Sequence, residues 1–356
     1  MTDASSFKEP LRAWMDERGV PGLSAHLTTP AGATRIVVGW RNLASRTPMV
    51  PDTLMGIASL TKMFTATAVL QLAAGGQLSL DDPVVRYLPG FATLRLPDPG
   101  AVALRHLLAH SGGLPGYSRA FNLRTKWAHY TEAQRAYWQR AEPGIGPAIL
   151  TTDDLLDAMA GEGDPPVGRP GEHFSYSNEG YALLGAIVGQ VSGLGYPACL
   201  AHHIFEPAGM ARATFEMPGP DDEPVTRLYD PGTPPIEIPA WPQGPATLAD
   251  GFLRTTAADL VRFLDALSSG HLLPSSWFAE MTTPHSPVAD GRSYGFGCYQ
   301  DQIAGEAAWF HTGDMAGVGS FMGVLPARRI RIAVLTNLSG APAEEAASLI
   351  LRKVLG

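Results

Sequence analysis

The sequence predicts an α+β fold, in which an antiparallel sheet is flanked by helices from the two chain ends and a mostly helical region is inserted. Strand-like segments occur near the N-terminus and again in the last third, whereas helical pieces cut by Pro and Gly fill the middle. The 356 residues provide enough chain for two domains. We therefore expect a discontinuous sheet domain, 1–76 and 251–356, around an inserted region, 77–250, with the functional site between them.

The first expected elements are a short helix, a hairpin and a central helix. Apolar side chains recur at helical spacing over 7–18, and the turn Pro30-Ala31-Gly32 separates strand-like runs at 23–28 and 34–39. The segment 59–74 is apolar on nearly every side and is followed by Gly75-Gly76, a typical helix stop. We expect this helix to be buried at the centre of the molecule.

The later elements are shorter in the middle of the chain and strand-like after it. Three helices are expected at 104–110, 152–160 and 179–191. The proline-rich segment 218–245 is expected to be a long surface loop, and Thr255 or Thr256 to cap a helix that ends near Ser269. Four strands and a last helix should follow, at 294–300, 307–312, 320–325, 330–336 and 342–355.

Composition excludes several classes of protein. With 45% hydrophobic residues, 17% charged residues and a net charge of -8, the chain is neither disordered nor rich in the clustered basic residues that nucleic-acid binding needs. Two cysteines, Cys199 and Cys298, are too few for a disulfide scaffold. The polar start and the lack of a long apolar run predict a cytoplasmic protein with no membrane contact. No cofactor or metal is expected.

Ser59-Leu60-Thr61-Lys62 lies at the start of the buried helix. A spacing of three puts Ser59 and Lys62 on one helix face, and the free N–H groups of a helix N-terminus favour an anion. Burial would lower the pKa of Lys62, which suits it to proton transfer. This segment therefore predicts an acyl-transfer nucleophile beside a base. Alternatively, Ser59 only caps the helix, and Ser5 and Lys8 show that the same spacing also occurs in the polar N-terminus.

Two further polar triplets could complete such a site. Tyr176-Ser177-Asn178 precedes the helix 179–191 and offers a phenol as a base and an amide for a substrate carbonyl, although it could simply cap that helix. His311-Thr312-Gly313 and Asp314 end a strand-like run, where Gly313 would let a substrate approach and the N–H of Asp314 could complete an oxyanion hole. The alternative for His311 is a buried structural histidine.

Ser-x-x-Lys, Tyr-Ser-Asn and His-Thr-Gly in this order resemble the serine β-lactamase and penicillin-recognising superfamily. The surrounding segments at 19–22, 104–115 and 255–260 are similar to its class C β-lactamase-related branch, and the resemblance covers about residues 7–354. It implies that Ser59 is the acylated nucleophile, that Lys62 and Tyr176 transfer protons, and that Asn178 contacts the substrate carbonyl. It also implies that His311, with Thr312 and Gly313, lines the far wall, and that the N–H groups of Ser59 and Asp314 bind the oxyanion.

This resemblance defines the type of reaction more closely than it defines the substrate. The branch includes β-lactamases, carboxypeptidases, D-aminopeptidases, esterases and acyltransferases. Many β-lactamases have Lys where His311 stands, and since a histidine is mostly neutral at pH 7, we discount β-lactam hydrolysis. A small-molecule or short-peptide acyl substrate is expected. Ester hydrolysis comes first, D-residue amide or peptide hydrolysis second, and acyl transfer or thioesterase-cyclase activity third. A non-catalytic sensor that is acylated once is the alternative from a different functional class. The sequence does not define the oligomeric state.

Three other patterns in the sequence could carry chemistry. Ser293 lies in a Gly-x-Ser-x-Gly sequence, which would be a hydrolase elbow only if a strand preceded it and a helix followed it. His106 and His110 could share a helix face and bind zinc, although structural histidines are expected there. The aromatic and basic stretch 117–140 is expected to be a surface helix and loop; as a hypothesis, it covers the site and selects the acyl group.

Overall fold

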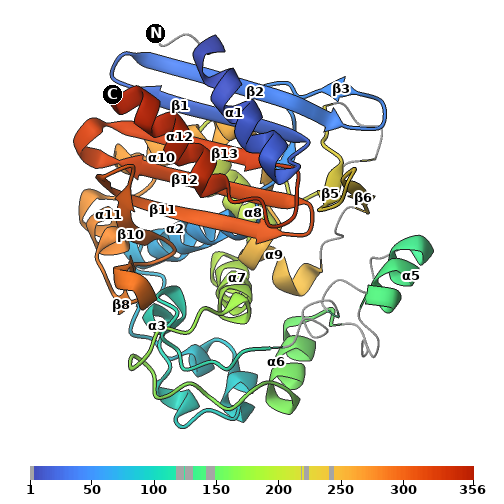
Figure 1. Ribbon diagram of the computed structural model, residues 1–356. Coiled ribbons are helices and arrows are strands. Elements are labelled where there is room, and N and C mark those ends of the chain that lie inside the picture. The colour runs from blue at the N-terminus through green and yellow to red at the C-terminus, as the bar shows by residue number, and fades with distance from the viewer. Residues whose placement is uncertain are drawn as a thin grey trace.

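The computed structural model describes residues 4–117, 124, 131–141, 149–217, 219, 224–239 and 244–356. It confirms the α+β prediction, because a nine-stranded antiparallel sheet carries helices on both of its faces (Figure 1). The strand order is β3-β2-β1-β13-β12-β11-β10-β9-β8. These strands are β1 Gly22–Thr29, β2 Gly32–Asn42, β3 Thr47–Pro48, β8 Ser286–Pro287, β9 Ser293–Tyr294, β10 Tyr299–Ile303, β11 Glu306–Met315, β12 Val318–Leu325 and β13 Ile330–Thr336.

The two ends of the chain are joined in this sheet. Strand β1 pairs with β13, and Leu23 lies opposite Thr336. The terminal helices α1, Ser5–Arg18, and α12, Ala343–Leu355, pack against each other and across one face of the sheet (Figure 1). Helix α10, Ala257–Ser268, packs against the other face. Hydrophobic residues alternate to both faces of the central strands, so the sheet is buried on both sides.

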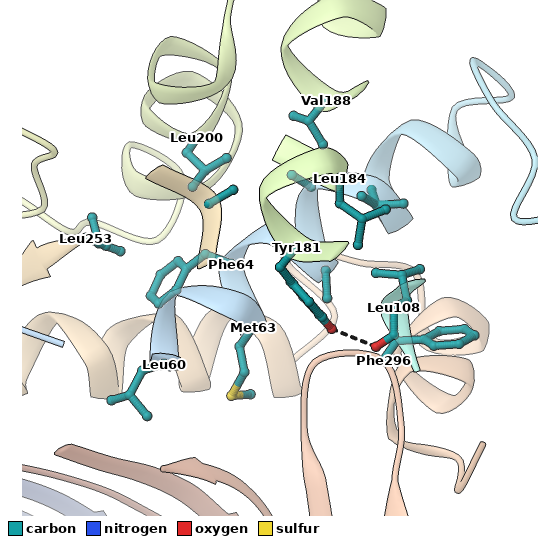
Figure 2. Packing of buried hydrophobic residues seen from close by; sticks show 14 of the residues in the cluster. Leu60, Met63, Phe64, Leu108, Tyr181, Leu184, Val188, Leu200, Leu253 and Phe296 are labelled. Carbon is teal, nitrogen blue, oxygen red and sulfur yellow. Dashed lines mark hydrogen bonds between the residues drawn. The ribbon is translucent and has the colours of Figure 1, made fainter. Parts of the chain in front are cut away.

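A second, larger core lies beyond α10 and is organised by helix α2, Thr61–Ala74. Phe64 of α2 stacks on Phe263 of α10, with ring centroids 3.9 Å apart. Helices α3, Leu104–Leu108, and α7, Asn178–Ser192, close this core, where the Tyr181 hydroxyl donates a 2.7 Å hydrogen bond to the Leu108 carbonyl (Figure 2). The predicted central burial of α2 is confirmed: nearly all of its residues are buried, and it packs against α10 through Phe64 and against α7.

Short elements complete the described chain. They are the helices α5 Glu132–Ala141, α6 Thr152–Gly161, α8 Tyr196–Leu200, α9 Leu248–Gly251 and α11 Ser275–Thr282, and the two small ladders β4 Met55–Gly56 with β7 Arg254–Thr255 and β5 Leu228–Asp230 with β6 Ile236–Ile238. No described residue between 77 and 250 belongs to the nine-stranded sheet. We therefore propose the division into 1–76 with 251–356 and an inserted 77–250.

A membrane-spanning helix is not found in the part of the chain that the structure describes. No single helix there has both the length and the apolar composition, and the pair Asn178–Ser192 and Tyr196–Phe205 reaches them only jointly, across a bend of 76°.

Three expected elements differ in detail. The helix expected from Ser59 begins at Thr61, because Ala58–Leu60 forms a separate 3-10 turn. The expected strand 294–300 is two short strands, since a turn containing Gly297, with φ +79°, packs against α2 between them. The segment 218–245 contains the β5-β6 hairpin, with Tyr229 buried, and is not a plain surface loop over its described residues.

Candidate active site

Ser59 lies in a tightly held 3-10 turn, Ala58–Leu60, between the sheet and α2. Ala58 has φ +47°, a left-handed conformation that costs energy for a residue other than glycine. Ser320 of β12 donates a 2.7 Å hydrogen bond to the Ile57 carbonyl, and the Thr61 hydroxyl donates one of the same length to the Ala58 carbonyl. These bonds hold the turn, in which Ser59 is half-buried.

Lys62 is fully buried one helical turn after Ser59. Its Nζ donates to the Ser59 Oγ at 3.1 Å, to the Asn178 Oδ1 at 2.8 Å and to the Asp250 carbonyl at 2.5 Å. The three donors of the ammonium group therefore have three acceptors. Burial lowers the pKa of Lys62 to about 8, while the nearby Asp250 and Glu179 act to raise it. An amine with this pKa can gain and lose a proton near neutral pH.

Tyr176 and Asn178 reach Lys62 from the start of helix α7. Ser177 caps this helix, because its hydroxyl accepts a hydrogen bond from the Gly180 N–H at 2.9 Å. The cap places the residues on either side of it near Lys62: the Asn178 Oδ1 accepts a hydrogen bond from the Lys62 Nζ, and the centre of the Tyr176 ring is 4.9 Å from that nitrogen. Ser59 is close enough to the Tyr176 phenol to act on its pKa. Desolvation of the phenol raises the pKa of Tyr176, although 37% of the residue stays exposed.

Strand β11 forms the wall opposite Tyr176. A Cβ added at Gly313 would lie 2.6 Å from the Ile57 carbonyl and 3.0 Å from the Ser59 backbone N, and it would also meet the Ser320 hydroxyl. Only glycine therefore lets the strand run this close to the Ser59 turn. The next residue, Asp314, is exposed, and its Oδ1 accepts a hydrogen bond from the Gly340 N–H.

His311 is placed differently from the expected wall position. The residue is only 1% exposed, its Nε2 is hydrogen-bonded to the Tyr294 hydroxyl at 3.0 Å, and its Nδ1 lies 2.6 Å from the Thr312 carbonyl. Burial lowers the pKa of His311 to about 3, so the ring is neutral at pH 7. The imidazole thus lies beneath the wall, and substrate contact stays a prediction for Thr312, Gly313 and Asp314.

Sequence reasoning missed three neighbours of the site. Asp250 contributes a backbone carbonyl, which no side-chain pattern reveals. Glu179 is buried beside Asn178 and accepts a 3.2 Å hydrogen bond from the Ser177 hydroxyl; burial raises the pKa of Glu179 to about 7. Its position next to the Tyr-Ser-Asn triplet was the available signal. His110 is expected from the sequence to be a structural histidine, with zinc binding as the alternative, and neither role indicates that it packs against Tyr176.

The structure also places the Ser293 sequence, the histidine pair and the described part of the stretch 117–140. Ser293 is followed by the strand residue Tyr294 and a turn rather than a helix, so the hydrolase-elbow reading is wrong. His106 and His110 each accept a backbone N–H at Nδ1, and among the described residues no group of three or more His, Cys, Asp or Glu could hold a metal ion. Much of the stretch 117–140 lies outside the described residues, which there comprise Tyr117, Arg124 and 131–140.

Comparison with known proteins identifies the family. The family model described as "Beta-lactamase" matches residues 7–355. The chain belongs to the beta-lactamase family. It is a serine hydrolase with the fold shared by β-lactamases and penicillin-binding proteins, which confirms the resemblance seen in the sequence.

Individual members of the beta-lactamase family are similar over nearly the whole chain. Penicillin-binding protein 4 of Amycolatopsis lactamdurans is 28% identical over 378 residues, which cover 99% of this chain and 90% of the relative. The structure of the octameric penicillin-binding protein homologue from Pyrococcus abyssi has a TM-score of 0.83 and 30% identity, covering 100% of this chain and 78% of that one. A D-stereospecific amidohydrolase from Streptomyces sp. has a TM-score of 0.79 and 27% identity, covering 98% and 97%.

We predict that Gly313→Ala lowers kcat by about 100-fold, the effect typical of a displaced oxyanion donor. The added methyl group would push β11 away from the Ser59 N–H. Gly161→Ala is the matched control, because a Cβ there meets no atom within 4 Å and the backbone is not left-handed. Steady-state kinetics and a thermal melt of both variants check the prediction; an active Gly313→Ala enzyme would contradict the proposed place of the oxyanion.

Proposed function

We propose that this enzyme hydrolyses carboxylic esters of neutral, largely apolar acyl groups through an acyl-enzyme on Ser59. The observation that carries the proposal is the contact between the Ser59 hydroxyl and the buried Lys62 amine, which joins a nucleophile to a base of suitable pKa. Tyr176, whose phenol lies beside Ser59 and whose ring centre is 4.9 Å from the Lys62 Nζ, completes the proton-transfer group.

In the proposed acylation step, the Ser59 oxygen attacks the ester carbonyl while neutral Lys62 accepts the hydroxyl proton. The N–H groups of Ser59 and Asp314 hold the oxyanion, and the Asn178 amide orients the acyl part. Collapse breaks the bond to the alcohol, which leaves with a proton relayed through Tyr176. Water then attacks the acyl-enzyme by the same proton path, which releases the acid and restores Ser59.

The preference for apolar acyl groups is supported by a cavity of about 850 Å³ whose lining includes neighbours in sequence of the site residues. Gly56, Gly251 and Met315 line it: Gly56 is three residues before Ser59, Gly251 follows Asp250, whose carbonyl binds Lys62, and Met315 follows Asp314. Most other lining residues are apolar, among them Leu54, Met217, Val225, Ile238, Phe252 and Val318. Thr131, Ala133, Tyr137 and Arg140 also line it, which supports a selecting role for the described part of 117–140.

Neutral substrates are favoured over carboxylate-bearing β-lactams because the β11 wall has no positive charge at the position of His311. The position where many β-lactamases carry lysine holds a histidine that burial keeps neutral and covered. His311 therefore supplies no positive charge to a substrate carboxylate.

A D-amino acid amide is the second candidate. Its specific support is the exposed Asp314 carboxylate, adjacent to the proposed oxyanion N–H, where it could pair with a substrate ammonium group. The similarity to a D-stereospecific amidohydrolase from Streptomyces sp. also supports this candidate.

We predict steady turnover of p-nitrophenyl esters by the wild type, weaker turnover of D-phenylalanine amide, and little hydrolysis of a chromogenic cephalosporin. Ser59→Ala should abolish ester turnover, because no other described hydroxyl contacts Lys62. Release of product followed spectroscopically separates the cases. A single burst without a steady rate would indicate an acylated sensor, and amide turnover exceeding ester turnover would make the second candidate the function.

We further predict that kcat/KM rises with acyl length from acetyl to octanoyl esters. Ala316→Trp, at the half-buried β11-β12 turn that lines the cavity, should cancel this rise while acetyl ester hydrolysis persists, because the indole would fill the acyl space. Ala327→Trp, on the exposed β12-β13 connection, is the matched control. If Ala316→Trp left the dependence of kcat/KM on acyl length unchanged, the cavity would not be the acyl-binding site.

A further inference from the structure

His110 is a buried histidine that the proposed mechanism does not use. It lies just after helix α3 with φ +54°, a left-handed conformation in which His and Asn are enriched among non-glycine residues. The residue is 2% exposed. Such a strained, buried polar residue next to a reaction centre calls for a physical reason.

The hydrogen bonds of His110 bracket Tyr176 on both sides. The His110 carbonyl accepts a 2.6 Å hydrogen bond from the Ser175 N–H, and its Nδ1 accepts one of 3.0 Å from the Ser177 N–H. The residues immediately before and after Tyr176 are therefore tied to a single residue. This fixes the backbone from which the phenol projects toward Ser59.

The His110 ring also supports the Tyr176 ring directly. Their centroids are 4.2 Å apart with an angle of 35° between the planes. Tyr181 and Tyr294 surround the imidazole, at 4.9 and 4.8 Å, so the ring has little room to move. Burial, with Lys62 and His311 nearby, lowers the pKa of His110 well below its ordinary value, which keeps Nδ1 available as an acceptor.

We propose that His110 is a positioning residue for catalysis, which holds the Tyr176 phenol beside Ser59 through two backbone hydrogen bonds and a ring contact. This inference rests on the proposed role of Tyr176. A misplacement of about 1 Å in a reacting group can cost about 100-fold in rate. His110 therefore acts on kcat through Tyr176, with little effect on substrate binding.

A double-mutant cycle tests the proposal with a p-nitrophenyl ester. His110→Ala is expected to lower kcat by about 100-fold, with KM changed by less than about threefold, because positioning of the proton-transfer group is lost. Tyr176→Phe should lower kcat by a similar or larger factor, about 100-fold or more. The double variant is expected to be no slower than Tyr176→Phe alone, since His110 would have no phenol left to position.

Two further variants make the test specific. His110→Asn keeps an acceptor near the Nδ1 position and tolerates the left-handed backbone, so it should recover most of kcat, and it takes the place of His110→Ala in the cycle if that variant does not fold. His106→Ala is the matched control: His106 lies on helix α3, one turn before His110, and also accepts a backbone N–H, from Ala103, and kcat should not change.

The outcomes distinguish a failure of the positioning role of His110 from a failure of the proposed role of Tyr176. Multiplying losses in the double variant, or a loss in KM alone, would overturn the positioning role of His110 while leaving the Ser59 and Lys62 chemistry intact. Full activity of Tyr176→Phe would instead overturn the proposed role of Tyr176, and with it this inference.

Discussion

The burial of the Lys62 amine is the constraint on which the site depends. A charged group removed from water is costly unless acceptors replace its hydration. Ser59, Asn178 and Asp250 supply those acceptors from three separate segments, α2 with its preceding turn, α7 and α9. Folding of the apolar core thus brings together the groups of the site, since Lys62 can be buried only when all three segments are in place. The same burial brings its pKa into a useful range.

The architecture explains how β11 meets this group. The sheet joins strands from both ends of the chain, and its central strand β12 anchors the Ser59 turn through Ser320. Gly313, on the neighbouring strand, allows the closest approach to the Ser59 N–H. The wall of the site is therefore part of the sheet, while Tyr176 and Asn178 come from the helical core, so that the site lies where the two meet.

Periodicity and local spacing predicted the sheet, most helices and the shared helix face of Ser59 and Lys62. That Tyr176 and Asn178 join them was implied only by the family resemblance, and the structure brings both residues to Lys62. The sequence did not predict contacts made through backbone atoms or across the fold. The Asp250 carbonyl has no compositional signature, and the covered position of His311 depends on a contact with Tyr294, 17 residues earlier in the chain. The strand expected over 294–300 failed because Gly297 turns the chain against α2, a tertiary contact that strand propensity cannot reveal.

The protonation of Lys62 can be measured directly, because the chain has only four lysines. Selective ¹⁵N and ¹³C labelling of lysine gives four side-chain signals, and the one lost in Lys62→Arg belongs to Lys62. The account predicts that this signal titrates with a midpoint near pH 8. A midpoint at the ordinary lysine value of 10.5 would contradict it, because Lys62 would then stay charged and could not accept the Ser59 proton.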